Sequence, residues 1–104
     1  MVRLNFDQTI NIQERAETGI SLKQNMPNPF NNTTIIEFEL DKQMEISFEV
    51  LDITGKVVKV LNLGNMGVGA HQINLNSDSF RNGIYYYSIY NDEFKVTKKM
   101  LIQK

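Results

Sequence analysis

Residues 33–40 read Thr-Thr-Ile-Ile-Glu-Phe-Glu-Leu, and the alternation within this stretch decides the fold class. From Ile36 to Leu40 an apolar side chain stands at every second position, with Glu37 and Glu39 between them. When apolar residues recur at every second position of a strand, one set of side chains faces a core and the other faces solvent. We therefore predict a β-strand with one buried face.

Residues 44–51 repeat this alternation, with apolar side chains from Ile46 to Val50 on one face. Only the Asp-Lys-Gln sequence at 41–43 separates the two stretches. Two neighbouring strands joined by so short a connection commonly form an antiparallel hairpin. We therefore predict that the two stretches pair with each other.

Segments rich in β-branched and aromatic residues continue to the end of the chain, and turn-forming residues interrupt them about every 8–12 residues. No segment shows the sustained apolar period of about 3.6 residues that marks an amphipathic helix. This spacing predicts an all-β antiparallel sandwich of about seven strands, one of them contributed by the N-terminal tail. The remaining strands are predicted at residues 56–61, 71–75, 84–90 and 94–103, with connections at 52–55, 62–69, 76–83 and 91–93.

The inward-facing positions of these strands define the expected core. Truncating a large core side chain to alanine is expected to cost about 2–5 kcal/mol. The predicted core residues are Ile36, Phe38, Leu40, Ile46, Phe48, Val50, Val58, Leu61, Ile73, Leu75, Tyr85, Tyr87, Ile89 and Met100.

Both prolines of the chain lie in residues 24–31, Gln-Asn-Met-Pro-Asn-Pro-Phe-Asn, which we call the proline segment. Pro27 and Pro29 each fix φ near about −65°, remove a backbone donor and favour an extended conformation at the residue before them. The proline segment is therefore predicted to be a stiff, extended lead into the domain, with Phe30 as its anchor.

Residues 1–20 differ from the rest because a polar run ending at Gly19 follows only a few apolar residues. We interpret them as a linker or N-terminal tail that contains at most one strand. Residues 21–104 are predicted to form the domain, and 104 residues is a usual length for a chain with one domain.

Composition excludes several classes of function. The net charge of −1 provides no broad field that would attract nucleic acid or an anionic membrane. The absence of cysteine excludes disulfides, thiol nucleophiles and thiolate metal sites. No apolar run approaches the about 18 residues of a membrane-spanning helix. Because no basic-then-apolar signal pattern opens the chain, any export signal would lie outside it.

No constellation of catalytic or cofactor-binding residues is apparent. His71 is the only histidine, and its neighbours Ala70 and Gln72 offer no catalytic partner, so we interpret it as a half-buried strand residue. The glycine-rich residues 64–69 lack the helix and the Lys-Ser/Thr pair of a phosphate-binding loop. We therefore predict no enzymatic activity, no cofactor, no metal ion and no small-molecule substrate.

Three surface features have alternative interpretations. Outward-facing glutamates of the predicted hairpin would form an acidic patch for Ca²⁺ or a basic partner, or a solvated face that deters aggregation; the solvated face is favoured. The tyrosines at 85–87 would stack on carbohydrate, or fill the core on one side and cover the sheet on the other; the core is favoured. The C-terminal lysines would protect an edge strand or be read by a receptor. The glutamates are Glu37, Glu39, Glu45 and Glu49, and the lysines are Lys95, Lys98, Lys99 and Lys104.

In order and spacing, these motifs resemble the type A C-terminal sorting domain of the type IX secretion system of Bacteroidetes. The resemblance covers residues 20–104, with Met26 where the family often has tyrosine and Asn32 where proline is frequent. The residues that match the family motif include Gln24, Asn25, Pro27, Asn28, Pro29, Phe30, Asn31, Gly55, Gly83 and Tyr85, followed by a terminal strand at Lys98, Lys99, Met100, Leu101, Ile102, Gln103 and Lys104.

The resemblance implies an Ig-like β-sandwich that is not an enzyme and that directs a larger cargo protein through the outer-membrane translocon. It implies passage through the periplasm, removal of the domain by a sortase-like peptidase within residues 1–21, and a cargo held at the outer-membrane surface or released outside the cell. From their position at the free end, we expect residues 98–104 to be read by the translocon.

Two other functions fit parts of the same pattern. The opening motif and strand order also resemble Ig-like spacer domains similar to the C-terminal domain of the flagellar hook-capping protein, which would make this chain a structural module. Exposed tyrosines around a groove would indicate a carbohydrate-binding module. Edge strands on either side would allow weak self-association.

Overall fold

The structure is a computed structural model that describes residues 18–104. Its seven strands form two antiparallel sheets, so the predicted all-β antiparallel sandwich of about seven strands is confirmed. The strands are β1 (Ile20–Leu22), β2 (Thr33–Leu40), β3 (Met44–Asp52), β4 (Val57–Met66), β5 (Gly69–Asn76), β6 (Gly83–Tyr90) and β7 (Lys95–Ile102).

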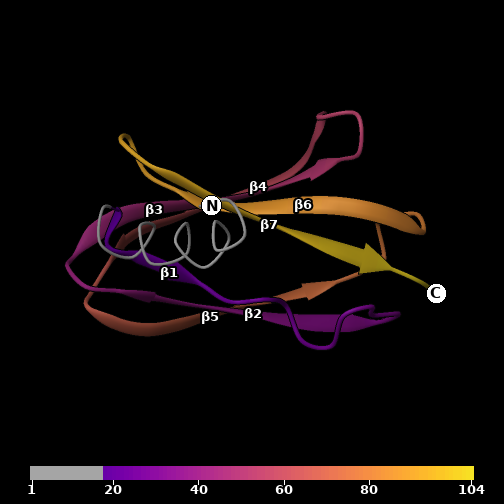
Figure 1. Cartoon of the computed structure of the whole chain (residues 1–104), viewed down its shortest axis with the longest axis horizontal. Coiled ribbons are helices and arrows are strands. Elements are labelled where there is room, and N and C mark those ends of the chain that lie inside the picture. Colours follow the sequence, from indigo (N-terminus) through magenta and orange to yellow (C-terminus); the bar gives the residue numbers. More distant parts are fainter. Residues whose placement is uncertain (1–17) are drawn as a thin grey trace, which may run out of the picture.

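The two sheets lie face to face as the layers of Figure 1. One sheet has three strands in the order β1-β2-β5, and the other has four in the order β4-β3-β6-β7. β7 is therefore an edge strand, and it slants toward the three-stranded sheet as it approaches the C-terminus (Figure 1). At this edge Phe30, in the connection between β1 and β2, forms an isolated bridge with Ile102.

The predicted hairpin between residues 33–40 and 44–51 is wrong. β2 pairs with β1 and β5, whereas β3 pairs with β4 and β6, so the short link at 41–43 carries the chain from one sheet to the other. The alternation in the sequence reports which face of a strand is buried, and it is the same whether neighbouring strands pair or face each other across a core.

The glycine-rich stretch at 62–69, predicted to be a loop, is also mostly strand. β4 continues to Met66 and β5 begins at Gly69, leaving a two-residue turn. Gly64 has a φ of 76° close to a register shift in the β3–β4 pairing, where glycine permits the irregular backbone. The glycines thus accommodate a bulge in β4 and a tight turn that carries the chain from the four-stranded sheet to β5 of the three-stranded sheet.

Most of the predicted core is buried, and Val58 is the clear exception at 41% exposed. Val50 pairs with Lys59 and Leu51 with Val57, which leaves Val58 as the extra residue of a bulge and breaks the alternation. Leu61 is only half-buried and packs against the core. Buried apolar residues that the alternation missed are Ile20, Leu22, Phe30, Phe80, Val96 and Ile102.

The strand that the N-terminal tail was predicted to contribute is β1, which crosses the predicted domain boundary between residues 20 and 21. Ile20 is fully buried and pairs with Leu40 of β2. The alternative strand within residues 1–12 lies outside the described residues. Within residues 18–104, no helix is long and apolar enough to span a bilayer.

Candidate functional site: the C-terminal edge strand and the proline segment

The predicted recognition residues 98–104 are divided between the core and the surface. Met100 and Ile102 are buried, so a partner cannot touch their side chains in the folded domain. Lys98 is half-buried on the same face, whereas Lys99 points to the outer face and is exposed. Side chains that remain accessible at least in part are those of Lys98, Lys99, Leu101, Gln103 and Lys104.

The proline segment runs along the outer edge of β7 and occupies part of its backbone. The N–H of Phe30 donates to the carbonyl of Leu101 at 3.1 Å, and the N–H of Gln103 donates to the carbonyl of Phe30 at 2.9 Å. The N–H of Leu101 also donates to Oδ1 of Asn28 at 2.9 Å. Residues far apart in the sequence thus cover the end of the last strand.

A fourth bond extends this cover by one position, because Nε2 of Gln24 donates to the carbonyl of Lys99 at 2.7 Å. Backbone groups at alternate positions of a strand point to the same side. The outward-facing residues of β7 are therefore the odd-numbered ones, and the proline segment covers them from the Lys99 carbonyl to Gln103.

A buried polar network holds the proline segment in place. Asn25 is 1% exposed, and its Nδ2 donates to the carbonyl of Pro27 and to Oγ1 of Thr34, each at 3.0 Å. The backbone N–H of Asn25 donates to the Tyr87 hydroxyl at 2.8 Å. Burial raises the pKa of Tyr87 to about 12, while the bond from Asn25 opposes this shift. No buried side-chain polar atom of the described residues lacks a hydrogen-bond partner.

Phe30 anchors the segment, as predicted, since its ring is buried in the core. The Met26–Pro27 and Asn28–Pro29 peptide bonds are both cis. The segment contains no helix, as predicted, but it is not extended throughout, because residues 27–29 bend between isolated bridges to Ile35 and Ile102.

The other residues of the sequence motif occupy structural positions. Gly55 has a φ of 92° in the β3–β4 turn, where Oδ1 of Asp52 accepts bonds from the hydroxyl and N–H of Thr54. The Thr54 hydroxyl and, next, the N–H of Lys56 lower the pKa of Asp52. The Tyr85 hydroxyl donates to the carbonyl of Arg81 at 2.9 Å and fixes the start of β6.

The acidic patch, considered as the alternative to a solvated face on the predicted hairpin, is not formed. Glu37 lies on the three-stranded sheet, whereas Glu45 and Glu49 lie on the four-stranded sheet. Glu49 is buried, and its Oε2 accepts a 2.8 Å bond from Nζ of Lys95, a side chain that is 52% exposed. Lys95 also lies 5.2 Å from the ring centroid of Tyr90. One of the four C-terminal lysines is therefore engaged within the domain.

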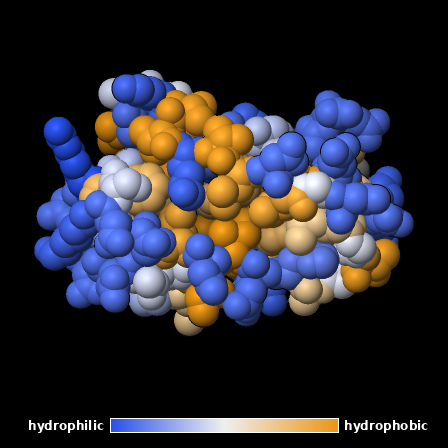
Figure 2. Space-filling view, turned by 180° about the vertical axis from the view of Figure 1, so that it is seen from behind, coloured by the Kyte–Doolittle hydropathy of each residue, from blue (hydrophilic) through white to orange (hydrophobic). Residues whose placement is uncertain are grey.

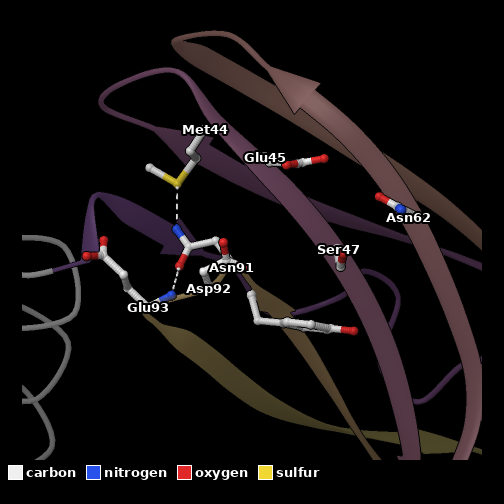
Figure 3. Close-up of a pocket in the computed structure, with 8 residues that line it drawn as sticks. Met44, Glu45, Ser47, Asn62, Asn91, Asp92 and Glu93 are labelled. Carbon is white, nitrogen blue, oxygen red and sulfur yellow. Dashed lines mark hydrogen bonds between the residues drawn. The ribbon is translucent and has the colours of Figure 1, made fainter.

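The surface depression drawn in Figure 3 has a volume of about 620 Å³ and is lined by carboxylates and amides. Asn91 fills its base, donating from Nδ2 to Sδ of Met44 at 3.2 Å and accepting from the N–H of Glu93 at 2.8 Å. The carboxylates of Glu45 and Glu93 lie well apart in the view and do not point toward each other (Figure 3). Among the described residues, no cluster of acidic or histidine side chains is arranged to hold a metal ion.

The remaining candidates have structural roles. Tyr85 and Tyr87 are buried and Tyr86 is 36% exposed, so the three tyrosines do not form a stacking platform. His71 is half-buried, as expected. Its ring centroid lies 5.4 Å from that of Phe38, and its Nε2 lies 2.8 Å from the carbonyl of Gly67.

The two edges of the four-stranded sheet differ in character. From the side opposite to Figure 1, an apolar stretch crosses the middle of an otherwise mostly polar surface (Figure 2). The exposed large apolar side chains include three on β4, namely Val57, Val58 and Val60. The edge at β7 carries lysines instead.

Comparisons with known proteins gave a family match and a structural neighbour. The family model described as the secretion system C-terminal sorting domain matches residues 26–103, from the proline segment to the residue after β7. A crystal structure of the Ig1 domain of mouse SynCAM 2 is similar at 13% identity and a TM-score of 0.40, covering 72% of this chain and 87% of that chain. None of the curated proteins compared with the chain matches it in sequence.

Proposed function

Because this chain belongs to the family of C-terminal sorting domains of the type IX secretion system, which direct cargo secretion, we propose that the translocon reads its C-terminal edge strand. The family is non-catalytic, and the cargo it directs crosses the outer membrane. The accessible side chains of this surface are Lys98, Lys99, Leu101, Gln103 and Lys104.

The proposal is supported mainly by the hydrogen bonds that join the proline segment to the outer edge of β7. Phe30 and Asn28 bond to Leu101 and Gln103, and this holds the last strand in one register relative to the start of the domain. A sorting domain must present the same surface behind any cargo. Hydrogen bonds that begin and end within the domain make this surface independent of what precedes it.

The position of β1 also bears on where the domain would be cleaved from its cargo. We propose that a sortase-like peptidase cuts within residues 1–21 and that the cargo then remains at the outer-membrane surface or is released outside the cell. The pairing of Ile20 with Leu40 favours a bond before Ile20, because a peptidase needs an extended, unpaired substrate.

A reporter fusion in a host with a type IX system tests the proposal. Deleting residues 95–104 should abolish export, and normal export of the deletion would contradict it. Because the deletion also removes β7, the charges are tested separately with Lys98→Gln and Lys99→Gln. Their control is Lys42→Gln with Lys56→Gln, which removes two exposed lysines elsewhere. Export should fall only in the first pair.

A further inference from the structure

The outer edge of β7 is covered only in part. Leu101 and Gln103 use their outward backbone groups to bond the proline segment, and the Lys99 carbonyl is bonded by Gln24. By the same alternation, the N–H of Lys99 and both backbone groups of Thr97 point outward. Within residues 18–104, no hydrogen bond from another segment reaches them.

The open stretch is well suited to accept another strand. β7 keeps an uninterrupted register with β6 from Gly83–Ile102 to Tyr90–Lys95. β4, at the opposite edge, contains two register shifts, and bulges disrupt the straight row of groups that an added strand needs. A five-residue stretch from Lys95 to Lys99 offers about 16 Å of regular edge.

Charge indicates what kind of strand would bind. Lys98 and Lys99 lie on opposite faces at this edge, whereas Lys95 is already paired with Glu49. Of the two edge strands of the other sheet, β1 has only three residues, and β5 is regular but carries no charged residue. Within residues 18–104, Lys98 and Lys99 form no ion pair, and an added strand with two consecutive acidic residues would place one carboxylate beside each of them.

We propose that an extended acidic segment of the translocon adds as a fifth strand to the four-stranded sheet, along Lys95–Lys99 of β7. Backbone bonds to Thr97 and Lys99 supply the affinity of such strand addition, and the two lysines supply its specificity. This inference rests on the proposed function, and it names the chemistry by which the edge is read.

A proline at position 97 tests the backbone contact. Because the N–H of Thr97 points away from β6, Thr97→Pro removes the outward donor while sparing the ladder, and edge strands tolerate proline at such positions. The hydroxyl of Thr97 also bonds Ser88 at 2.7 Å, so Thr97→Val is the control that removes this bond but keeps the N–H.

The β5 edge provides a matched control for the proline itself. Ile35 exchanges two 2.9 Å backbone hydrogen bonds with Met26, so its backbone groups point away from β5. The backbone groups of the next residue, Ile36, therefore point toward β5, where Ile36 is paired with Ile73. The N–H of Gln72 therefore points outward from β5. Gln72→Pro introduces the same change on an uncharged edge.

The measurement is binding of the full chain, fused to a reporter, to the detergent-solubilised outer-membrane translocon of a type IX host. Thr97→Pro should weaken binding at least about tenfold and lower export, since it removes one bond and blocks strand approach. Thr97→Val and Gln72→Pro should bind like the parent. Parent-like binding by Thr97→Pro would overturn strand addition. If export then still depended on Lys98 and Lys99, the proposed function would stand without it.

Hydrogen exchange on the parent chain gives a test that does not depend on a variant folding. The amides of Thr97 and Lys99 should exchange at least about tenfold more slowly when the translocon is bound, as hydrogen-bonded amides do. The Gln72 amide should not change. Unchanged exchange at Thr97 and Lys99 would overturn the inference. If, without translocon, these two amides exchanged more slowly as the concentration of the chain rose, the inference would also be overturned. That result would show that the β7 edge pairs with a second copy of the chain.

Discussion

The hydroxyl of Tyr87 accepts a 2.8 Å hydrogen bond from the backbone N–H of Asn25, although the two residues lie 62 positions apart. The same hydroxyl donates to the carbonyl of Lys23 at 2.8 Å. One side chain of β6 therefore satisfies two backbone groups where the chain leaves β1 and enters the proline segment.

Replacing Tyr87 with phenylalanine leaves the buried N–H of Asn25 without its acceptor. Because an unsatisfied buried group costs about 1–3 kcal/mol, Tyr87→Phe should lower the free energy of unfolding by about that amount. Chemical denaturation followed by circular dichroism measures the change. The control Tyr86→Phe alters a partly exposed side chain and should stay within about 0.5 kcal/mol of the parent. Equal stability of the two variants would contradict this role for the Tyr87 hydroxyl.

The same residue makes stability depend on pH in the alkaline range. Burial raises the pKa of Tyr87 from 10.0 to about 12, so the folded state holds the phenol protonated after the unfolded state has ionised. The stability from this group is fully present below pH 10 and is lost as the pH rises through about 12. The free energy of unfolding should fall over this interval, less steeply in Tyr87→Phe. Parallel curves for the two proteins would refute the assignment.

Phe30 should contribute far more to stability than its apolar neighbour in the proline segment. Phe30 is 2% exposed, whereas Met26 is 71% exposed. Truncating a buried phenylalanine costs about 3–5 kcal/mol, so Phe30→Ala should be destabilising by that amount and Met26→Ala nearly neutral. Amide exchange at Gln103 should accelerate only in Phe30→Ala, because Phe30 holds the acceptor of that bond in place. Slow exchange at Gln103 in Phe30→Ala would show that the segment stays bound without its anchor.

Lys95 and Lys99 should differ in their effect on folding, although both are exposed lysines of β7. Lys95→Met leaves the buried carboxylate of Glu49 without its partner, and we expect a loss of about 1–2 kcal/mol, discounted for the partial exposure of Lys95. Lys99→Met should be nearly neutral. Adding Glu49→Gln to Lys95→Met should recover part of the loss, and a double-mutant cycle measures the coupling. Additive effects of the two substitutions would rule out a contribution from the pair.

The sequence predicts the buried faces of the strands well and their partners poorly. The alternation in β2 assigns Ile36, Phe38 and Leu40 to the core correctly, because burial of one face leaves a direct mark on composition. The same alternation says nothing about whether β3 lies beside β2 or across from it. In β4 a bulge at Val58 breaks the period, and a pattern that assumes regular pleating assigns that residue to the wrong face.

The candidate site was predictable only as two separate segments. Prolines mark residues 24–31 and lysines mark the last strand, but the bonds that join them run through the backbone of Phe30, Leu101 and Gln103. Backbone bonds leave no signature in side-chain identity. The Asn28 and Gln24 contacts with β7 depend on side chains, yet asparagine and glutamine beside proline indicate only a turn.

The contact between the proline segment and β7 has a consequence for how the protein is made. A ribosome synthesises residues 24–31 long before it reaches residues 95–103, so the segment has no edge to cover until translation of the domain is complete. A precursor that stops early lacks both the strand and the register that the segment imposes. The covered edge can therefore form only after residues 95–103 have been synthesised, and any product truncated before them lacks it.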